Sequence, residues 1–428
     1  MLALAAAARK AAGAAFLSAA VFGCGGDSSS GQASQGQEPT PEPGIPAEGY
    51  VRLAFNESPF GPPPAAPAAI ESLLDRPSAM SGPDTAFLPG INRYPDFLNT
   101  ALTKLIAARH SLSTRHVVPC CGISELLYMC CRAFLGPGRS LLVREGSFPL
   151  PVWYAEQGGC EVRKVPLRGG RAADPEAMLG AVDGTTGLVY IANPDNPEGS
   201  LLSAGDLETF VEQVYRRSPQ TAVLVDEAYM EYVLREPRPE AIPLVFRYPV
   251  LVGRTFSKAW GMAGLRAGYV VGNEELILIL NGLLSGYIGG DPGWRMFEGN
   301  VNRIAAAAIE GVLNAEGFAF VDSVRERNAA LRSYLAGSLA GLGFESLPSE
   351  ASFLFVPIGS DGEDLRRWLC GRNVLVQAGA SFHPAYADRI RVSVGSREEL
   401  DAFLEALSAY DPSAGRPPSC FRVFYHGI

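Results

Sequence analysis

Short apolar runs alternate with stretches of helical periodicity over the middle of the chain. Seven runs have the length and the polar or glycine borders of buried strands: Val117–Pro119, Leu141–Val143, Val162–Val165, Leu188–Ile191, Val223–Val225, Leu251–Val252 and Gly268–Val271. Helical patterns lie between most of them, for example at Glu125–Phe134 and Leu207–Tyr215. This alternation predicts an α/β fold with a mostly parallel, seven-stranded sheet that helices cover on both faces.

The pattern changes from about Val301 onward. Longer helical stretches and short apolar runs predict a smaller α+β domain with helices Arg303–Leu313 and Phe318–Leu339, strands Phe353–Val356 and Ile390–Val394, and a closing helix near Arg397–Leu407. The expected division is a large domain of residues 86–300, a small domain of residues 301–412, an N-terminal arm of residues 50–85 that belongs with the small domain, and a tail of residues 413–428.

The N-terminal residues differ in character from the rest of the chain. An apolar stretch over residues 11–22, preceded by two basic residues, is too short for a transmembrane helix and fits a signal-peptide core. If residues 1–24 are a lipoprotein-type signal, Cys24 carries the lipid and the polar residues 25–49 form a disordered tether. A cytoplasmic alanine-rich extension or a misassigned start codon is the alternative, so the localisation stays open between a lipid-anchored exported form and the cytoplasm.

The composition favours a small-molecule enzyme. The 428-residue chain is 47% hydrophobic and carries a formal net charge of −9. Because it has no long basic run, it lacks the electrostatic footprint of a nucleic-acid-binding protein. The eight cysteines include the adjacent pairs Cys120-Cys121 and Cys130-Cys131 but no CxxC spacing, so we expect no zinc site and interpret them as small apolar core residues.

Ligands in open α/β sheets bind just beyond the carboxyl ends of the strands. The residues that directly follow the predicted strands therefore form a candidate site. They are Gly122-Ile123-Ser124-Glu125, Ser147-Phe148, Asn193-Pro194-Asp195-Asn196-Pro197, Asp226 with Tyr229, and Thr255 with Ser257 and Lys258. One edge of the sheet is thus predicted to gather helix-start amides, an aromatic ring, a carboxylate, a phenol, hydroxyls and a lysine.

Several of these groups suit a phosphate. The hydroxyls of Thr255 and Ser257 and the guanidinium of Arg266 can donate to a phosphate dianion. A helix that starts at Gly122 would add backbone N–H groups and the positive end of its dipole. Lys258 beside such a site is either a phosphate ligand or a Schiff-base former. A Walker-type nucleotide site would need GxxxxGKS or GxxxxGKT, which the sequence lacks.

Asp226 decides between these two interpretations of Lys258. It follows the apolar run Ala222-Val223-Leu224-Val225, at the end of a buried strand, where a carboxylate needs a cationic partner. The pyridinium nitrogen of pyridoxal 5′-phosphate is such a partner, and an Asp there keeps the ring protonated as an electron sink. The structural alternative is an Asp that caps a helix or a turn.

Six motifs, in order along the chain, resemble class I/II aminotransferases of fold type I, and most closely the histidinol-phosphate aminotransferase group. They are Asn56-Glu57-Ser58-Pro59-Phe60-Gly61-Pro62, Arg93-Tyr94-Pro95-Asp96, Asn193-Pro194-Asp195-Asn196-Pro197-Glu198-Gly199, Asp226-Glu227-Ala228-Tyr229, the segment from Gly253 to Arg266, and Arg391-Val392-Ser393-Val394-Gly395. The resemblance runs from about Val51 to Leu407. It implies pyridoxal 5′-phosphate as cofactor, a homodimer with shared active sites, and exchange of an amino group between an amino acid and a 2-oxo acid.

The resemblance also implies a role for each matching residue. Lys258 would hold the cofactor as a Schiff base and move the proton at the substrate Cα, and Asp226 would pair with the ring nitrogen. Tyr229 and Asn196 would bond the ring oxygen, and Phe148 would stack on the ring. The expected phosphate ligands are Gly122, Ile123, Ser124, Thr255, Ser257 and Arg266, with Tyr94 reaching the phosphate of the neighbouring subunit. Arg391 would grip the substrate α-carboxylate, and Asn56 is a further candidate substrate-binding residue.

Two departures from the family pattern bear on the substrate. Histidinol-phosphate aminotransferases carry an arginine for the substrate phosphate shortly before the carboxylate clamp. Gln377 stands at or near that position here, and an amide cannot neutralise a phosphate as a guanidinium does. An apparent insertion at residues 284–294 suits a loop over the active-site mouth, although loops also tolerate neutral insertions. Arg295 follows it and could replace the missing arginine.

Two other classes of function remain open from the sequence. A decarboxylase or an eliminating lyase on the same scaffold would share the electronics, because the reaction depends on which Cα bond stands perpendicular to the ring. A tethered lipoprotein that binds a ligand without catalysis would not need a complete catalytic set. The intact set argues against it: Lys258, Asp226, Asn196, Tyr229 and Arg266.

Overall fold

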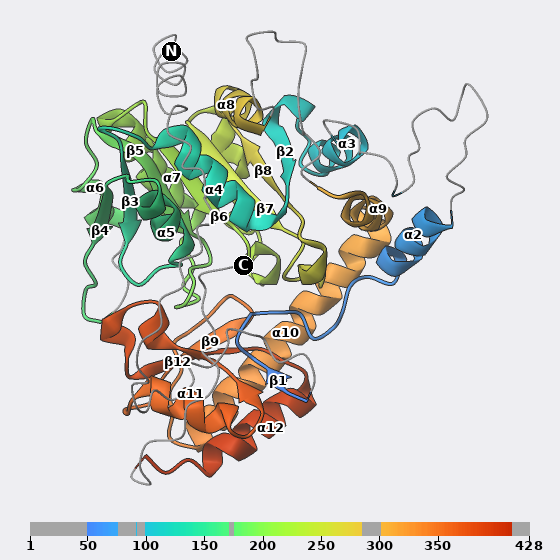
Figure 1. The fold of residues 1–428 in the computed structure, drawn as a ribbon, viewed down its shortest axis with the longest axis vertical. Coiled ribbons are helices and arrows are strands. Elements are labelled where there is room, and N and C mark those ends of the chain that lie inside the picture. The colour runs from blue at the N-terminus through green and yellow to red at the C-terminus, as the bar shows by residue number, and fades with distance from the viewer. Residues whose placement is uncertain (1–48, 76–90, 92–98, 171–174, 285–300, 413–428) are drawn as a thin grey trace, which may run out of the picture.

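The computed structural model describes residues 49–75, 91, 99–170, 175–284 and 301–412. Its largest element is a seven-stranded sheet with the strand order β2-β8-β7-β6-β5-β3-β4 (Figure 1). The strands are β2 (Val117–Cys120), β3 (Ser140–Arg144), β4 (Val162–Val165), β5 (Thr186–Ala192), β6 (Ala222–Asp226), β7 (Val250–Thr255) and β8 (Gly268–Gly272). β8 is antiparallel to both neighbours, and the other adjacent pairs are parallel.

Helices pack on both faces of this sheet (Figure 1). One face, with Val189 and Val223, shares a core with α3 (Thr100–Arg109), α6 (Pro175–Leu179), α7 (Ala204–Arg217) and α9 (Arg303–Val312). The other face, with Leu188 and Leu224, shares a core with α4 (Gly122–Phe134), α5 (Leu150–Gln157) and α8 (Glu274–Leu284). Successive strand residues point to opposite faces, so central strands covered on both sides need continuous apolar runs.

The remaining described elements form a smaller α+β region (Figure 1). An antiparallel sheet of β11 (Gln377–Ala378), β12 (Arg389–Ser393) and β9 (Phe353–Pro357) lies in it. The helices α10 (Ala315–Gly341), α11 (Gly362–Cys370) and α12 (Arg397–Ser408) contribute to its core. The first strand, β1 (Val51–Arg52), pairs in parallel with β10 (Val374–Leu375), whereas the next helix, α2 (Ala65–Leu74), packs on α9. The N-terminal segment therefore runs from the smaller region to the larger one.

The fold class expected from the sequence is confirmed. Each of the seven predicted apolar runs lies within one strand of the large sheet, and the sheet is mostly parallel. The sequence missed β1, β10 and β11, because a two-residue strand is too short to show a period. The predicted domain boundaries stay predictions. The signal segment with Cys24, the Tyr94 motif, residues 285–294 of the insertion, and Arg295 lie outside the described residues.

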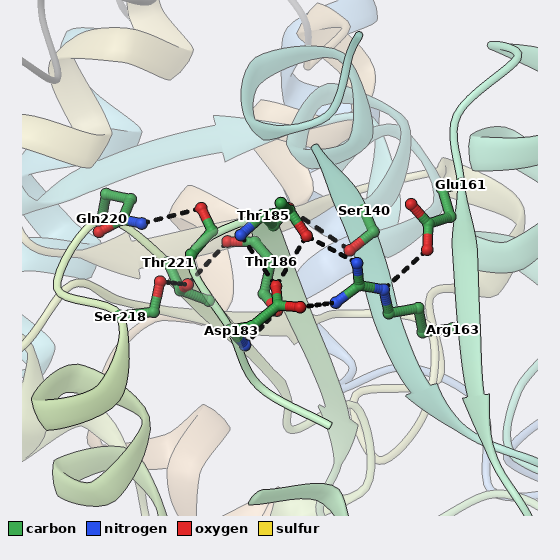
Figure 2. Close-up of polar contacts among 10 residues, drawn as sticks. Ser140, Glu161, Arg163, Asp183, Thr185, Thr186, Ser218, Gln220 and Thr221 are labelled. Atoms are coloured by element: carbon green, nitrogen blue, oxygen red, sulfur yellow. Dashed lines mark hydrogen bonds and ion pairs between the residues drawn. The ribbon is translucent and has the colours of Figure 1, made fainter. Parts of the chain in front are cut away.

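Hydrogen bonds join polar side chains at the edge of the large sheet where its parallel strands begin (Figure 2). Arg163 on β4 donates to Asp183 Oδ2 at 2.7 Å and to Thr185 Oγ1 at 2.6 Å. Thr221, just before β6, donates to the carbonyl oxygen of Thr186 at 2.7 Å. These bonds pair polar groups from β4 and from the turns before β5 and β6. Ligands in open α/β sheets bind at the opposite, carboxyl-terminal edge, which is therefore the place to look for a site.

The described residues give little sign of metal or membrane binding. No group of three or more His, Cys, Asp and Glu side chains there could hold a metal ion. Within the same ranges no single helix is long and apolar enough to cross a membrane, and one bent pair, α9 with α10 at 87°, meets the length and composition criteria. Five described cysteines are free thiols. Cys370 is disulfide-bonded and, as expected, is buried in an apolar cluster with Ala54 and Leu375.

Candidate active site

A cavity of about 270 Å³ opens at the carboxyl ends of β5, β6 and β7. Its lining combines strand ends, the first turn of α4 and the segment after β1. The lining residues are Arg52, Phe55, Glu57, Ile123, Ser124, Phe148, Leu150, Tyr190, Ala192, Asn196, Asp226, Ala228, Tyr229, Thr255, Ser257, Lys258, Ala263, Gly264 and Arg266. A concave, largely apolar site with a few convergent polar groups is typical of small-molecule binding.

Asp226 is a buried carboxylate at the end of β6. Its Oδ2 accepts a hydrogen bond from Tyr190 Oη at 2.9 Å, and its Oδ1 accepts one from the Ala228 amide at 3.1 Å. Burial raises the pKa of Asp226 to about 6, although these two hydrogen bonds act in the opposite direction. A carboxylate held in this way favours a cationic partner in the cavity, which would restore its charged form.

Lys258 projects into the same cavity from the turn after β7. Its Nζ donates to the Phe55 carbonyl oxygen at 2.8 Å. Burial is the largest cause that lowers the pKa of Lys258 to about 7, and the positive charge of Arg391 is the second. An amine with that pKa exists in both protonation states near neutral pH, which suits a nucleophile and a proton carrier.

The start of α4 and the turn after β7 form a second group of donors. Gly122 opens α4 with φ +78°, and a Cβ there would lie 3.0 Å from an Arg266 guanidinium nitrogen. Arg266 has φ +53° and donates through Nη1 to Ser257 Oγ at 3.4 Å. Because Thr255, Ser257 and Arg266 converge on a helix N-terminus, they can bind an anion such as phosphate.

Asn56 and Arg391 stand directly behind residues that line the cavity. Asn56 Nδ2 donates to Tyr229 Oη at 2.8 Å, and the Asn56 amide donates to Ser393 Oγ at 2.8 Å. Arg391 is fully buried and donates through Nη1 to Asn196 Oδ1 at 2.7 Å. Its Nη2 donates to the carbonyl oxygen of Ala54. Both side chains therefore lie one hydrogen bond from the cavity.

The structure brings most of the sequence-predicted residues to this cavity. The predicted residues that line it are Ile123, Ser124, Phe148, Asn196, Asp226, Tyr229, Thr255, Ser257, Lys258 and Arg266. Gly122, Asn56 and Arg391 contact lining residues. Gln377 is the exception, because it does not line the cavity and its Nε2 donates to Ser381 Oγ at 2.6 Å. Gln377 lies on β11, opposite Arg391 on β12, and its amide forms this local hydrogen bond instead of pointing toward a ligand.

Sequence reasoning missed several lining residues. Tyr190 had a usable signal, because it lies two residues before the end of β5 and so on the same face as Ala192. Glu57 also had one, because it lies in the motif that starts at Asn56. Arg52 and Phe55 had none, because they belong to no predicted strand, helix or motif. They reach the cavity only because β1 pairs with β10 and Asn56 bonds to Ser393.

The family model of aminotransferase class I and II matches residues 48–407, so the chain belongs to that family. It is 32% identical to histidinol-phosphate aminotransferase of Shouchella clausii, over 84% of this chain and 88% of the relative. Its identity to histidinol-phosphate aminotransferase of Moorella thermoacetica is 33%, over 83% and 84%. Both relatives agree with the group that the sequence motifs resemble.

Solved structures give the same fold. Histidinol-phosphate aminotransferase from Sinorhizobium meliloti, in complex with pyridoxal 5′-phosphate, has a TM-score of 0.70 and 27% identity, over 83% of this chain and 89% of that chain. Aspartate aminotransferase from Thermus thermophilus with maleate has a TM-score of 0.68 at 22% identity, over 84% and 91%, and shares the fold. The protein is thus a pyridoxal-phosphate-dependent aminotransferase, an enzyme that acts on amino acids and 2-oxo acids.

The residues of the cavity fit this cofactor. Asp226 is a buried carboxylate that favours a cation, which is what a protonated pyridine ring offers. Lys258 supplies an amine in the same cavity. Arg266 and the N-terminus of α4 supply donors for the phosphate. No group in this donor set conflicts with the cofactor.

Proposed function

We propose that the cavity holds pyridoxal 5′-phosphate through Lys258, Asp226 and the donors around Arg266, and that a free α-amino acid is the substrate. The observation that carries the proposal is the pairing of a buried carboxylate with a low-pKa lysine in one cavity. When bound, the cofactor supplies an electron sink for negative charge at the substrate Cα.

Lys258 acts as the covalent anchor for the cofactor and then as the acid–base group at the substrate. The lysine must lose its proton to attack a carbonyl carbon, and a pKa near 7 makes the free amine available at neutral pH. Once free of the cofactor, the same amine would move a proton between the substrate Cα and the cofactor carbon to which the lysine had been bonded. A pKa close to the working pH is the best match for such a two-way transfer.

The other lining residues hold and tune the cofactor. Asp226 keeps the ring nitrogen protonated, with Tyr190 fixing the orientation of its carboxylate. Tyr229, oriented by Asn56, and Asn196 hydrogen-bond the ring oxygen, and Phe148 covers one ring face. The expected phosphate ligands are the backbone and side chains of Gly122, Ile123, Ser124, Thr255, Ser257 and Arg266.

Arg391 binds the α-carboxylate of the substrate. Its guanidinium already donates to Asn196, which lines the cavity, so a carboxylate beside Asn196 comes within reach of it. A planar guanidinium fixes a carboxylate bidentately, which orients the Cα bond that reacts. Histidinol phosphate has no α-carboxylate and gains nothing from this contact.

Histidinol phosphate is a poor substrate in this proposal. Among the described lining residues the cations are Arg52, Lys258 and Arg266, and Gln377 bonds to Ser381 outside the cavity. Loss of one charge-assisted hydrogen bond to a phosphate costs about 1.5–3 kcal/mol. That corresponds to a roughly ten- to hundredfold loss of affinity.

A kinetic comparison of histidinol phosphate with a panel of free amino acids tests the proposal. We expect a higher kcat/KM for at least one free amino acid, with conversion of the cofactor to its amino form. A highest kcat/KM for histidinol phosphate would show that another basic residue, such as Arg295, binds the phosphate. Release of carbon dioxide or ammonia without that conversion would instead identify a decarboxylase or a lyase.

We also propose a homodimer in which Tyr94, outside the described residues, reaches the cofactor phosphate of the neighbouring subunit. The family resemblance supports this arrangement. Sedimentation of the holoenzyme should give twice the chain mass. Mixing a Lys258→Ala chain with a Tyr94→Phe chain should restore one intact site per mixed dimer. A monomeric, fully active enzyme would contradict the shared site.

A further inference from the structure

A second cavity, of about 230 Å³, lies between the C-terminal end of α3, the turn after β7 and the first turns of α10. None of its lining residues lines the active-site cavity, and the proposed mechanism does not use it. Its volume is somewhat below the range of about 300–1,000 Å³ that is typical of pockets for drug-sized ligands. The second cavity therefore suits a molecule of about amino-acid size.

The backbone from the end of β7 to Trp260 separates the two cavities. Along it, the side chains that line the second cavity are Arg254, Phe256 and Trp260, and those that line the active-site cavity are Thr255, Ser257 and Lys258. Two backbone bonds close this turn, because Gly261 donates to the Lys258 carbonyl oxygen at 2.9 Å and Met262 donates to that of Phe256 at 3.0 Å. A ligand in the second cavity thus contacts the same turn that positions Lys258.

Glu231 brings a carboxylate with one free oxygen to the second cavity. It lies on the 3₁₀ turn Met230–Tyr232 and is only 8% exposed. Its Oε1 accepts a hydrogen bond from Arg254 Nη1 at 3.1 Å. Within the described ranges, its Oε2 accepts no hydrogen bond. Because buried polar groups are nearly always hydrogen-bonded, this oxygen favours a donor on a ligand.

Arg109, at the end of α3, is a cation of the same cavity without an acidic partner. Its guanidinium lies over the Phe318 ring, 4.3 Å from the centroid. Among the residues that the structure describes, it forms no ion pair and no hydrogen bond. Asp322, an acidic lining residue, pairs instead with Arg325 at 3.0 Å. The planar donors of Arg109 are therefore available to a carboxylate.

Aromatic rings form a continuous apolar wall of the second cavity. The ring centroids of Phe256 lie 5.7 Å from Trp260 and 5.6 Å from Tyr269. Trp260 in turn lies 5.8 Å from Phe318. All four rings line the cavity, so an apolar side chain of a ligand can be buried against them.

We propose that the second cavity binds a free amino acid with an apolar side chain as an effector. Its ammonium donates to Glu231 Oε2, its carboxylate accepts from Arg109, and its side chain packs on the aromatic wall. Through Phe256 and Trp260 the effector acts on the turn of Lys258. Binding in this cavity is independent of the proposed function, whereas the effect on turnover rests on it.

The charges around the cavity favour a ligand that carries both signs. A simple anion would leave the free oxygen of Glu231 unpaired and would be repelled by it. A simple amine would meet three guanidinium groups, those of Arg109, Arg238 and Arg254. His110 adds no charge at neutral pH, because burial and then the charge of Arg254 lower its pKa to about 3. A zwitterion satisfies both the carboxylate and the guanidinium.

Calorimetric titration of the holoenzyme with N-methyl-L-leucine tests the proposal. This probe keeps both charges and the apolar side chain, but as a secondary amine it is not a substrate for amino-group exchange. We expect saturable binding. 4-Methylpentanoate lacks the ammonium and leucinamide lacks the carboxylate, so each should bind at least about tenfold more weakly.

Substitutions in the second cavity locate the binding site. Glu231→Gln should weaken binding of the probe roughly ten- to hundredfold, and Arg109→Gln, at a more exposed position, about tenfold. Arg115→Gln is the matched control and should bind normally, since Arg115 is 76% exposed and pairs with Glu274 on the surface. Saturating probe should change the wild-type kcat at saturating substrate at least twofold. At the same concentration it should have less effect on Arg109→Gln.

Each alternative outcome has a distinct meaning. Probe binding that neither Glu231→Gln nor Arg109→Gln weakens would place the probe elsewhere and overturn the inference. Equal binding of the three probes would overturn the zwitterion assignment. Binding with an unchanged kcat would overturn the effect on the turn of Lys258. If the wild type transaminates no amino acid, the proposed function fails, and the calorimetric result still decides the binding site. Thermal denaturation of each variant identifies misfolding, and Arg109→Gln keeps the test open if Glu231→Gln does not fold.

Discussion

The two walls of the cavity are built in different ways. The cofactor wall contains Asp226, Thr255, Ser257 and Lys258, which follow the neighbouring strands β6 and β7, and Ser124 in the first turn of α4. The substrate wall consists of residues 52–57, which are fixed by strands and side chains more than 300 positions away, as the separation of 337 residues between Asn56 and Ser393 shows. The first wall is a product of sheet topology, whereas the second depends on long-range contacts with the smaller region.

The two walls therefore have different expected roles: the cofactor wall serves the reaction chemistry, and the substrate wall serves the choice of substrate. Asp226, Thr255 and Ser257 of the cofactor wall are buried, and the expected roles of this wall do not depend on which amino acid enters. The substrate wall carries a partly exposed ion pair, Arg52 with Glu57, on a short segment. Changes on the cofactor wall should therefore affect every substrate equally. Changes on the substrate wall should affect substrates selectively.

The sharpest test of the cofactor wall is Lys258→Ala. We expect loss of the visible absorbance of the lysine-bound cofactor and a decrease in kcat of at least 10³- to 10⁴-fold for all substrates. Steady-state assays and an absorbance spectrum of the purified protein measure both. Lys164→Ala is a suitable control, because Lys164 is a surface residue paired with Glu156. Wild-type absorbance in the Lys258 variant would remove this residue from the site.

Asp226→Ala should have the next largest effect. The variant should retain the cofactor through the phosphate donors. It should lose about 3–5 kcal/mol of transition-state stabilisation, because the charge on the ring nitrogen loses its carboxylate partner. That equals a roughly 10²- to 10⁴-fold lower kcat for every amino acid. Cofactor content after gel filtration and kcat are the two measurements, with exposed Asp206→Ala as control. Full activity would mean that the ring nitrogen lies elsewhere.

The pH dependence of apoenzyme stability also probes the cofactor wall. Burial, and then the charge of Arg391, lower the pKa of Lys258 from its ordinary value of 10.5 to about 7 in the folded chain. Between these values the unfolded chain binds a proton that the folded chain does not, so this residue makes stability rise with pH. The slope is at most about 1.4 kcal/mol per pH unit. Urea unfolding from pH 7 to pH 10 should show this rise in the wild type relative to Lys258→Met, and parallel curves would contradict it.

The smallest expected effect tests how the substrate wall is held. Ser393 Oγ accepts from the Asn56 amide and donates to Asn56 Oδ1 at 2.9 Å, so Ser393→Ala leaves two buried groups unpaired. We expect a loss of about 1–3 kcal/mol in unfolding free energy, with the cofactor spectrum retained. Ser408→Ala on the exposed end of α12 should change stability by less than about 0.5 kcal/mol. Equal effects of the two substitutions would mean that Ser393 does not anchor residues 52–57.

The same contrast explains how far the sequence could predict the molecule. Strand-end residues such as Asp226 and Lys258 were accessible, because an apolar run predicts a strand and a parallel sheet brings strand ends together. The identity of the cofactor followed from the type of these residues and from the family motifs. Arg52 had neither a period nor a motif to indicate it. Glu57 lay in a family motif, but its place at the cavity depends on the pairing of β1 with β10.

Gln377 shows a limit of a different kind. The alignment of motifs placed it near a substrate contact, but the side chain turns to Ser381 within its own turn. A sequence gives the position of a residue along a strand. The hydrogen-bond partner of a side-chain amide depends on which local groups the folded backbone brings within reach. Arg391, one strand away, does not line the cavity either, but it donates a hydrogen bond to Asn196, which does.

The pairing of β1 with β10 has a consequence for the order in which the site is made. Ribosomes release a chain from its N-terminus, so residues 122–266, which supply the cofactor wall, emerge before Val374–Leu375 exists. Val51–Arg52 emerges before both of these segments and has no partner strand until late in translation. A chain arrested between these two points carries the strand-end residues of the cofactor wall but lacks the strand that positions residues 52–57.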